Sequence, residues 1–300
     1  MTSGADPEAA GVDDRDLERV RRAVLTGAAT LWRDFPWRAT RDPWLVLVSE
    51  VMLQQTQAPR VVEPFGRFAA RFPTPAACAS AGAGEVVRAW AGLGYNRRAV
   101  NLHRASVVLV EHHGGRVPAA LDALEALPGV GPYTARAVLS FGHGTAVGVV
   151  DTNVARVLAR AVAGRPLSRA DAQRLADRLV PANDAWRFNQ ALFDLGARCC
   201  RARDPRCGSC PAATSCRWMR AGGGEPDPAA TGRHPQGVFA GSDRQGRGRL
   251  VAALRLAPVA VTALPAAAGW PGDGLRAQRI ATALVDEGIA CWQGDDLALA

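Results

Sequence analysis

The stretch from Leu127 to Asp151 places the strongest constraint on how this chain can fold. Residues 128–132 within it read PGVGP, with one glycine on each side of a single apolar residue. Apolar residues recur at helical spacing over 121–127, and residues 133–139 are a helix-forming run. Glycine allows a left-handed backbone and the close approach of another chain, and proline suits the first turn of a helix. The pattern therefore predicts two helices joined by a tight hairpin.

This hairpin has two interpretations. Its backbone N–H groups, at the start of a helix, are suited to bind an anion such as a DNA phosphate. An ordinary corner between two packed helices would be built from the same residue types. The hairpin alone leaves both open.

Composition narrows the class of protein. The chain has 300 residues, of which 48% are hydrophobic, enough to form one large or two modest domains. No run approaches the roughly 18 uncharged apolar residues that span a membrane. Residues 1–14 are acidic and rich in small residues, without the basic start and apolar core of a signal peptide. We therefore expect a disordered N-terminus and a cytoplasmic protein that does not contact membranes.

The charge of the chain is positive. The formal net charge is +8, and arginine carries it. A basic surface favours a polyanionic partner, but GC-rich genomes also encode arginine-rich proteins. Charge alone therefore does not establish nucleic-acid binding.

Helical periodicity dominates the first 235 residues. It predicts helices over residues 16–32, 44–53, 61–71, 83–91, 97–112, 154–162, 169–179 and 183–196. No alternation typical of a β-strand occurs before residue 236. The body of the protein is therefore predicted to be almost entirely α-helical.

One of these helices contains a carboxylate where apolar residues are expected. Asp42-Pro43 is a capping residue followed by proline at the first helical position, and residues 44–53 are apolar nearly all round. Glu50 lies among them. A buried carboxylate is costly unless it is paired or used in chemistry, whereas an open helix face would leave it in solvent.

Three further short segments carry candidate residues. Trp37-Arg38 would either pack on the core or line a pocket for a flat ring. The glycine loop 92–96 presents Leu93 and Tyr95, and it would either be an ordinary turn or wedge these side chains into a duplex. Asp151 has the position of a helix N-cap.

A cluster of cysteines indicates a metal site. Five of the seven cysteines lie within residues 199–216, which in a cytoplasmic chain favours metal binding over disulfides. Four of them have the spacing C-x6-C-x2-C-x5-C, namely Cys200, Cys207, Cys210 and Cys216. Four thiolates hold either a tetrahedral zinc ion or a [4Fe–4S] cluster. The single C-x2-C with unequal outer arms favours the cluster over zinc, with free thiols as a third alternative. Cys199 is surplus to four ligands and is expected to be a buried neighbour.

Together these motifs resemble the helix-hairpin-helix DNA glycosylases of the endonuclease III superfamily, most of all its MutY-type adenine glycosylases. The resemblance covers about residues 20–218. It rests on the four-cysteine spacing and on SEVMLQQTQ (49–57), GLGY (92–95), LPGVGPYTA (127–135), VVDTNVARVL (149–158) and FNQALFDLGARCC (188–200), all in family order. It implies a mainly α, two-lobed helix-hairpin-helix glycosylase fold, with a [4Fe–4S] cluster as cofactor in the loop 200–216.

The resemblance also implies catalytic roles. Glu50 would be the acid/base that protonates the adenine ring, and Asp151 would stabilise the sugar cation. Asn153 would orient the sugar or Asp151. Relatives with lysine at the position of Tyr133 form a Schiff base and nick the strand. Because tyrosine cannot form that imine, the resemblance implies a monofunctional enzyme.

Further positions are expected to contact DNA. Trp37, Arg38 and Gln190 would surround a flipped adenine, and Gln55 and Tyr95 would enter the base stack. The full set of expected substrate and DNA contacts comprises Trp37, Arg38, Gln54, Gln55, Leu93, Tyr95, Gly129, Gly131 and Gln190.

The tail departs from the usual family pattern. Residues 219–235 read as a linker because of GGG at 222–224 and PDP at 226–228. Residues 236–300 would form a small winged-helix-like module, or else a packing extension of the body. About 65 residues are too few for the NUDIX-like β-domain with which members of the family often end.

We therefore expect a monomeric, monofunctional adenine DNA glycosylase, associated with the nucleoid, that acts on adenine opposite 8-oxoguanine or guanine in double-stranded DNA. Two alternatives are a glycosylase for thymine or uracil opposite guanine, and a non-catalytic iron–sulfur DNA-binding protein.

Overall fold

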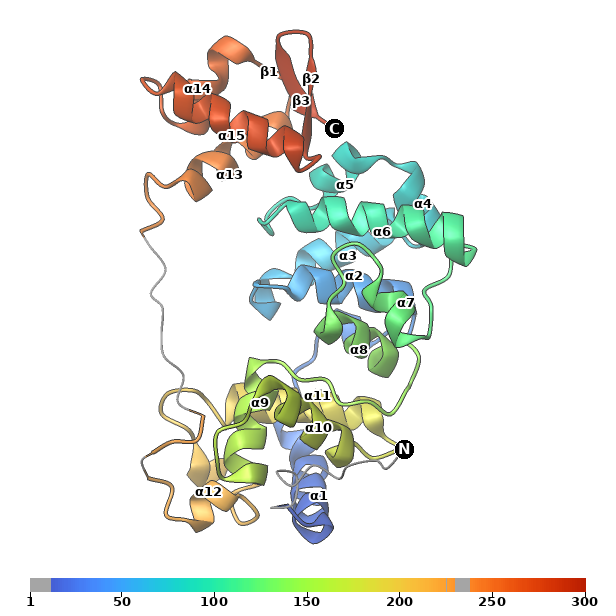
Figure 1. Cartoon of the computed structure of the whole chain (residues 1–300), viewed down its shortest axis with the longest axis vertical. Coiled ribbons are helices and arrows are strands. Elements are labelled where there is room, and N and C mark those ends of the chain that lie inside the picture. The colour runs from blue at the N-terminus through green and yellow to red at the C-terminus, as the bar shows by residue number, and fades with distance from the viewer. Residues whose placement is uncertain (1–11, 225, 230–237) are drawn as a thin grey trace, which may run out of the picture. The chain divides into compact units, whose positions relative to one another are not determined.

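The computed structural model describes residues 12–224, 226–229 and 238–300 (Figure 1). The chain divides into two compact units that alternate along the sequence. Unit 1 comprises residues 1–35 and 132–233, and unit 2 comprises residues 36–131 and 234–300. The boundary at residue 132 falls inside the predicted hairpin, so the two helices of the hairpin belong to different units.

Unit 1 is helical in its described residues. Its elements are α1 (Asp14–Leu31), α8 (Pro132–Phe141), α9 (Thr152–Val157), η4 (Leu158–Ala163), α10 (Arg169–Leu179), α11 (Ala185–Arg198), η5 (Cys207–Ser209) and α12 (Arg217–Arg220). Helix α1 packs along α11, and Val20, Leu158 and Phe188 are fully buried in the core that these elements share. The helical periodicity of these segments is therefore confirmed.

The helix expected over 154–162 is split in two. Helix α9 ends at Val157, and the chain continues as the wider π turn η4, which ends at Gly164 with a φ of 66°. Turns of this kind are rare and often mark functional sites. This one carries Arg160, whose side chain is 2% exposed.

The expectation of a disordered N-terminus was wrong for the residues that can be described. Residues 1–11 lie outside the described part of the chain. Asp13 caps α1 by accepting a hydrogen bond from the backbone N of Asp16 at 2.7 Å, and Asp14 is the first helical residue. These acidic side chains suggested disorder, but they instead satisfy and stabilise a helix N-terminus.

The linker expected over 219–235 also needs correction. Helix α12 extends to Arg220, and Asp227 forms an ion pair with Arg160. Residues 225 and 230–237 of the expected linker lie outside the described residues.

The first part of unit 2 is a second group of helices. Its elements are η2 (Pro36–Arg38), α2 (Pro43–Leu53), η3 (Ala58–Arg60), α3 (Val62–Arg71), α4 (Pro75–Ser80), α5 (Ala83–Ala89), α6 (Arg97–His113) and α7 (Leu121–Glu125). The long helix α6 packs against α2, α4 and α5. The predicted helices of this region are confirmed to within two residues at their ends, whereas the short helix α4 was not predicted.

The second part of unit 2, residues 238–300, is called the tail module below. It consists of α13 (Asp243–Leu254), β1 (Val259–Ala260), η6 (Val261–Ala263), α14 (Leu264–Ala268), α15 (Gly274–Asp286), β2 (Ala290–Gln293) and β3 (Asp296–Leu299). The three strands form an antiparallel sheet in the order β1-β3-β2, beside which the three helices pack (Figure 1). This order of elements is that of a winged helix, as expected, and the described residues before the tail module contain no strand.

Among the described residues, none of the helices combines the length and the apolar composition needed to cross a membrane.

Candidate functional site

Glu50 lies in the buried helix α2 of unit 2. Asp42 starts this helix by accepting a hydrogen bond from the backbone N of Trp44 at 2.8 Å, with Pro43 in the first turn. The indole N–H of Trp44 donates to the carbonyl of Phe72 at 2.9 Å and fixes the helix against α3. Because the helix is apolar nearly all round, only 4% of Glu50 is exposed. The solvent-facing alternative is thereby excluded.

Arg98 is a residue that sequence reasoning missed. It lies at the start of α6 and is 8% exposed. Its guanidinium donates to the carbonyls of Val51 and Met52 at 2.9 and 2.8 Å, and to the hydroxyl of Thr56 at 3.1 Å. It also donates to the carbonyls of residues 93 and 94, in the glycine loop. Burial lowers the pKa of Arg98 to about 10. One buried arginine thus joins the end of the Glu50 helix to two candidate DNA-contact segments. A basic residue directly after the glycine loop was the only sequence signal for it.

Two of the expected DNA-contact residues have strained backbones. Gln55 has a φ of 55° and Tyr95 a φ of 45°, in the left-handed region that non-glycine residues rarely occupy. Tyr95 is 50% exposed, and Gln55 is also exposed. Strain of this kind costs about 1–3 kcal/mol per residue and gathers at ligand-binding sites.

Leu93 is buried in this structure, with a side chain that is 3% exposed. Of the two alternatives for the glycine loop, an ordinary turn or a wedge, its burial without DNA fits the turn. It packs beneath the loop, while the neighbouring Tyr95 is the side chain that the loop presents.

Trp37 and Arg38 are both buried in the short helix η2, with exposures of 8% and 7%. The ring of Trp37 meets the ring of Phe65 edge-on, with centroids 5.9 Å apart. Trp37 therefore packs against α3 within unit 2.

The two glycines of the hairpin at residues 128–132 have different surroundings. Gly129 has a φ of 78°, and a Cβ there would lie 2.8 Å from the Cβ of Asn101, so only glycine fits. A Cβ on Gly131 would meet nothing within 4 Å. The side-chain amide of Gln54 donates to the carbonyl of Gly129 at 3.4 Å. The structure thus brings the hairpin and the polar segment after α2 together within unit 2.

Asp151 is held in unit 1 at the N-terminus of α9. Its Oδ1 accepts a hydrogen bond from the backbone N of Val154 at 2.7 Å, which is the N-cap bond that the sequence predicts. Its Oδ2 accepts from the side-chain amide of Asn153 at 2.8 Å. Two N–H donors and the N-terminal end of a helix therefore face this carboxyl group.

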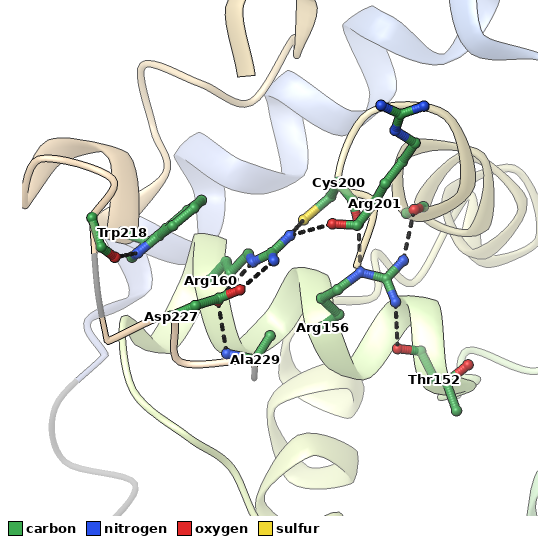
Figure 2. A network of polar contacts seen from close by, with 10 residues as sticks. Thr152, Arg156, Arg160, Cys200, Arg201, Trp218, Asp227 and Ala229 are labelled. Carbon is green, nitrogen blue, oxygen red and sulfur yellow. Dashed lines mark hydrogen bonds and ion pairs between the residues drawn. The ribbon is translucent and has the colours of Figure 1, made fainter. Parts of the chain in front are cut away.

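Arg156 connects Asn153 to the cysteine loop. Figure 2 shows its contact with Cys200. Its Nη2 donates to Oδ1 of Asn153 at 2.8 Å and to the carbonyl of Gly196 at 2.9 Å. Its Nε donates to the carbonyl of Cys200 at 2.6 Å. A continuous set of hydrogen bonds therefore runs from Asp151 to a predicted metal ligand, and sequence reasoning had not identified Arg156.

The segment before Asp151 is fixed by α11. Asn189, 1% exposed, accepts a hydrogen bond from the backbone N of Val149 and donates to the carbonyl of Val147 and the hydroxyl of Ser140. Gln190 follows it on α11 and is 6% exposed. Tyr133, in the first turn of α8, is half-buried. Asn189 was also missed, because its role depends on residues about 40 positions away in the sequence.

The four predicted metal ligands line one pocket. Its walls also include Arg160, Trp218 and the surplus Cys199. Cys199 is buried, as expected, with its Sγ 3.8 Å from the carbonyl of Ser209. In the described residues, no three His, Cys, Asp or Glu side chains converge on a point where a single ion would bind. The four thiols nevertheless line the same pocket, and thiolates are the usual ligands of iron–sulfur clusters.

Burial shifts the protonation of these thiols. Desolvation raises the pKa of Cys210 to about 12 and also raises the pKa values of Cys207 and Cys216. Thiolates, not thiols, bind iron, so loading of the site would release protons.

Arg160 is the charged group closest to this pocket (Figure 2). Its Nη1 lies 3.6 Å from Sγ of Cys200 and donates to the carbonyl of Arg201 at 2.7 Å. The opposite side of the guanidinium is ion-paired with Asp227, and its Cζ lies 4.9 Å from the ring centroid of Trp218. The hydrogen bond from Arg160 lowers the pKa of Asp227. The segment after the cysteine loop therefore closes back over the pocket.

The sequence of this chain is similar to those of known proteins. Residues 48–182 match the HhH-GPD superfamily of base excision DNA repair proteins. The adenine DNA glycosylase of Mycolicibacterium smegmatis is 44% identical over 261 residues, which cover 86% of this chain and 87% of that protein. The human adenine DNA glycosylase is 42% identical over 222 residues, which cover 68% of this chain and 40% of that protein. A match over 86% of the chain extends past residue 238, so the mycobacterial similarity includes part of the tail module.

Two solved structures share the fold. The structure of a thermostable thymine-DNA glycosylase has a TM-score of 0.66 and 31% identity, and the match covers 69% of this chain and 98% of that one. A trapped covalent intermediate of endonuclease III with DNA has a TM-score of 0.59 and 25% identity, over 68% of this chain and 97% of that one. In sequence and in fold, this chain belongs to the HhH-GPD superfamily of base excision DNA repair proteins.

Proposed function

We propose that this protein is a monofunctional DNA glycosylase of base excision repair that hydrolyses the N-glycosidic bond of adenine mispaired with 8-oxoguanine or guanine. The observation that carries the proposal is the contrast between two carboxyl groups. Glu50 is buried in an apolar helix, whereas Asp151 accepts two hydrogen bonds at a helix N-terminus. In glycoside hydrolysis, a buried carboxyl group of this kind serves as the acid, and a hydrogen-bonded one serves as the anion that faces the developing positive charge.

The reaction follows from these environments. Glu50 in its protonated form donates to a ring nitrogen of the adenine, and the bond from C1′ to the base breaks with its electron pair leaving on the base. Positive charge develops at C1′, where the ionised Asp151 stabilises it. Water adds to C1′ and gives up a proton to the Glu50 carboxylate, which restores the acid. The products are free adenine and an abasic site.

Other residues position the substrate. Trp37, Arg38 and Gln190 are proposed to contact the extruded adenine, and each of the three is buried in the protein without DNA. Gln55 and Tyr95 are proposed to enter the base stack, with Gln54 beside them. Gly131, where a side chain would meet nothing, leaves the N–H groups of the hairpin accessible to a DNA phosphate.

The cofactor is proposed to be a [4Fe–4S] cluster held by Cys200, Cys207, Cys210 and Cys216. Bound there, it would join the four thiolates into one rigid loop and supply a redox-active centre. Arg160 and Arg156 stabilise the same loop through Cys200, by its sulfur and its carbonyl respectively.

Adenine is favoured over the pyrimidine alternative by the relatives. Two named adenine DNA glycosylases are 42% and 44% identical to this chain, whereas the thymine-DNA glycosylase structure is 31% identical. Tyr133 is compatible with either specificity, for adenine or for a pyrimidine. Because tyrosine cannot form a Schiff base, it is the reason for proposing that the enzyme does not nick the strand.

A set of matched duplexes tests the proposal. Each carries one target, adenine opposite 8-oxoguanine, adenine opposite guanine, or thymine or uracil opposite guanine, and samples are analysed with and without alkali. We expect breaks at adenine only, and only after alkali. Breaks confined to thymine or uracil would establish the pyrimidine alternative, and breaks without alkali would contradict the monofunctional assignment. No breaks at any target would favour a protein that binds DNA without catalysis.

A further inference from the structure

One arginine of the tail module is hydrogen-bonded to two residues in the body of unit 2. Arg255 follows the last residue of α13, and its Nη2 donates to Oδ1 of Asn96 at 2.8 Å. Its Nε donates to the carbonyl of Val87 on α5 at 3.2 Å. Arg255 is half-buried, and burial lowers its pKa. Its two acceptors are a neutral side-chain amide and a backbone carbonyl, so the guanidinium is positioned by directed hydrogen bonds.

Asn96 forms the base of the loop that carries Tyr95. It is 6% exposed and caps α6, with its backbone carbonyl accepting from the N of Ala99 at 3.0 Å. The residue before it is the strained, half-exposed Tyr95. On the body side, Arg98 donates to the carbonyls of residues 93 and 94 in the same loop. The loop is thus held by one arginine from the body and one from the tail module.

Other contacts fix the module along α5 and α6. Strand β3 packs against α5, and a Cβ added to Gly84 would lie 2.3 Å from the carbonyl oxygen of Ala300. Arg104 on α6 donates to the carbonyl of Glu287 at 3.4 Å. Arg255 is therefore not an isolated surface contact but part of a packed boundary.

The charge of the module argues against a separate DNA-binding role for it. Residues 238–300 contain six arginines and six acidic residues, so their formal charges cancel. The turn between β2 and β3, which is the wing, carries Asp295, and β3 begins at Asp296. A surface that binds the phosphate backbone is expected to be positive.

We propose that the tail module acts as a support for the loop 92–96, and that Arg255 is the positioning residue through which it fixes Tyr95 for contact with duplex DNA. The contact of Tyr95 with DNA rests on the proposed function. The coupling between the module and the loop does not.

The coupling is tested by hydrogen exchange on the full-length protein without DNA. Arg255→Gln should increase amide exchange in the peptide covering residues 92–97 by about ten-fold, because the loop opens locally when the bond to Asn96 is lost. The matched control is Arg247→Gln, on the same helix, since Arg247 pairs with Glu287 inside the module and does not reach the loop. Unchanged exchange over 92–97 in Arg255→Gln would overturn the proposal, as would an equal increase in the control.

A double-mutant cycle distinguishes a specific effect of Arg255 on the loop 92–96 from a general loss of stability. In an Asn96→Ala background, Arg255→Gln should add little further exchange at the loop, because both changes remove the same bond. Additive effects would contradict a role through Asn96. Faster exchange confined to 238–300 would also contradict it.

The consequence for catalysis is measured separately. Arg255→Gln should slow single-turnover base release about ten-fold. Its melting temperature should equal that of the control variant Arg247→Gln. Arg255→Lys should recover part of the rate. Normal base release with a loosened loop would overturn the link to Tyr95. If the wild-type protein releases no base at all, the proposed function fails while the exchange result still decides the coupling.

Discussion

The side-chain amide of Asn153 holds the carboxylate of Asp151, with Nδ2 2.8 Å from Oδ2. The orientation of this amide is set from the other side, because Arg156 donates to its Oδ1. Arg156 in turn donates to the carbonyl of Cys200. The proposed catalytic anion and a proposed cluster ligand therefore share one arginine.

Arg156→Gln should slow base release about 10- to 100-fold, the range typical of residues that orient a functional ligand. The same substitution should lower the iron content per chain, because the bond to Cys200 is lost. Single-turnover rates and iron analysis measure the two effects. Arg174→Gln is the matched control, since Arg174 is an exposed arginine paired with Asp171 on α10. Full activity and full iron content in Arg156→Gln would contradict the shared role.

Glu50→Gln should reduce base release by at least about 10²- to 10⁴-fold, the usual contribution of a positioned general acid. Binding of the mismatched duplex should remain, because glutamine has the same shape and avoids burying a charge. Single-turnover rates and equilibrium binding to the same duplex are the measurements. Glu63→Gln serves as control, because Glu63 is exposed on α3 and paired only with Arg67. A Glu50→Gln protein that still releases base would disprove the acid role.

Asp227→Asn should weaken the cysteine loop. Arg160 is 2% exposed and would lose its counter-ion, at a cost of about 2–3 kcal/mol after allowance for the partial exposure of Asp227. Freed from Asp227, the guanidinium should also alter its hydrogen bond to Cys200 and so shift the reduction potential of the cluster. Chemical unfolding measures the loss of stability, iron analysis measures the weakening of the cysteine loop, and electrochemistry measures the reduction potential. Asp204→Asn is the control, because Asp204 lies in the same loop but is exposed. An unchanged potential with unchanged iron content would show that Arg160 does not depend on Asp227.

Arg98→Gln should destabilise the protein by about 3 kcal/mol or more, because it leaves several buried carbonyl groups without a donor. The neighbouring Arg97→Gln should have little effect, since Arg97 is exposed. Thermal and urea unfolding compare the two variants. Equal stability of both variants would mean that water replaces the guanidinium without cost.

Sequence periodicity predicted most of the longer helices because their buried residues repeat at 3.6-residue intervals. The caps at Asp42 and Asp151 were also predictable, because capping is a local interaction. Short elements were not: α4 spans only six residues, and β1 only two, so neither establishes a period.

The supporting residues of the site were the least predictable part. Arg98, Arg156 and Asn189 form hydrogen bonds with groups about 40 or more positions away, and only the folded chain brings these together. The role of Leu93 stayed open for a related reason. An apolar residue in a glycine loop fits both a wedge and a buried anchor, and its burial depends on what packs below the loop.

The most direct test of the proposed function is to identify the base that is released. Protein in excess over a duplex with adenine opposite 8-oxoguanine is quenched at intervals, and free bases are separated and identified by mass spectrometry. The account predicts one adenine per duplex, an intact strand before alkali, and no release by Glu50→Gln. Release of thymine or uracil from the guanine-mismatch duplexes, with no adenine from this one, would contradict it.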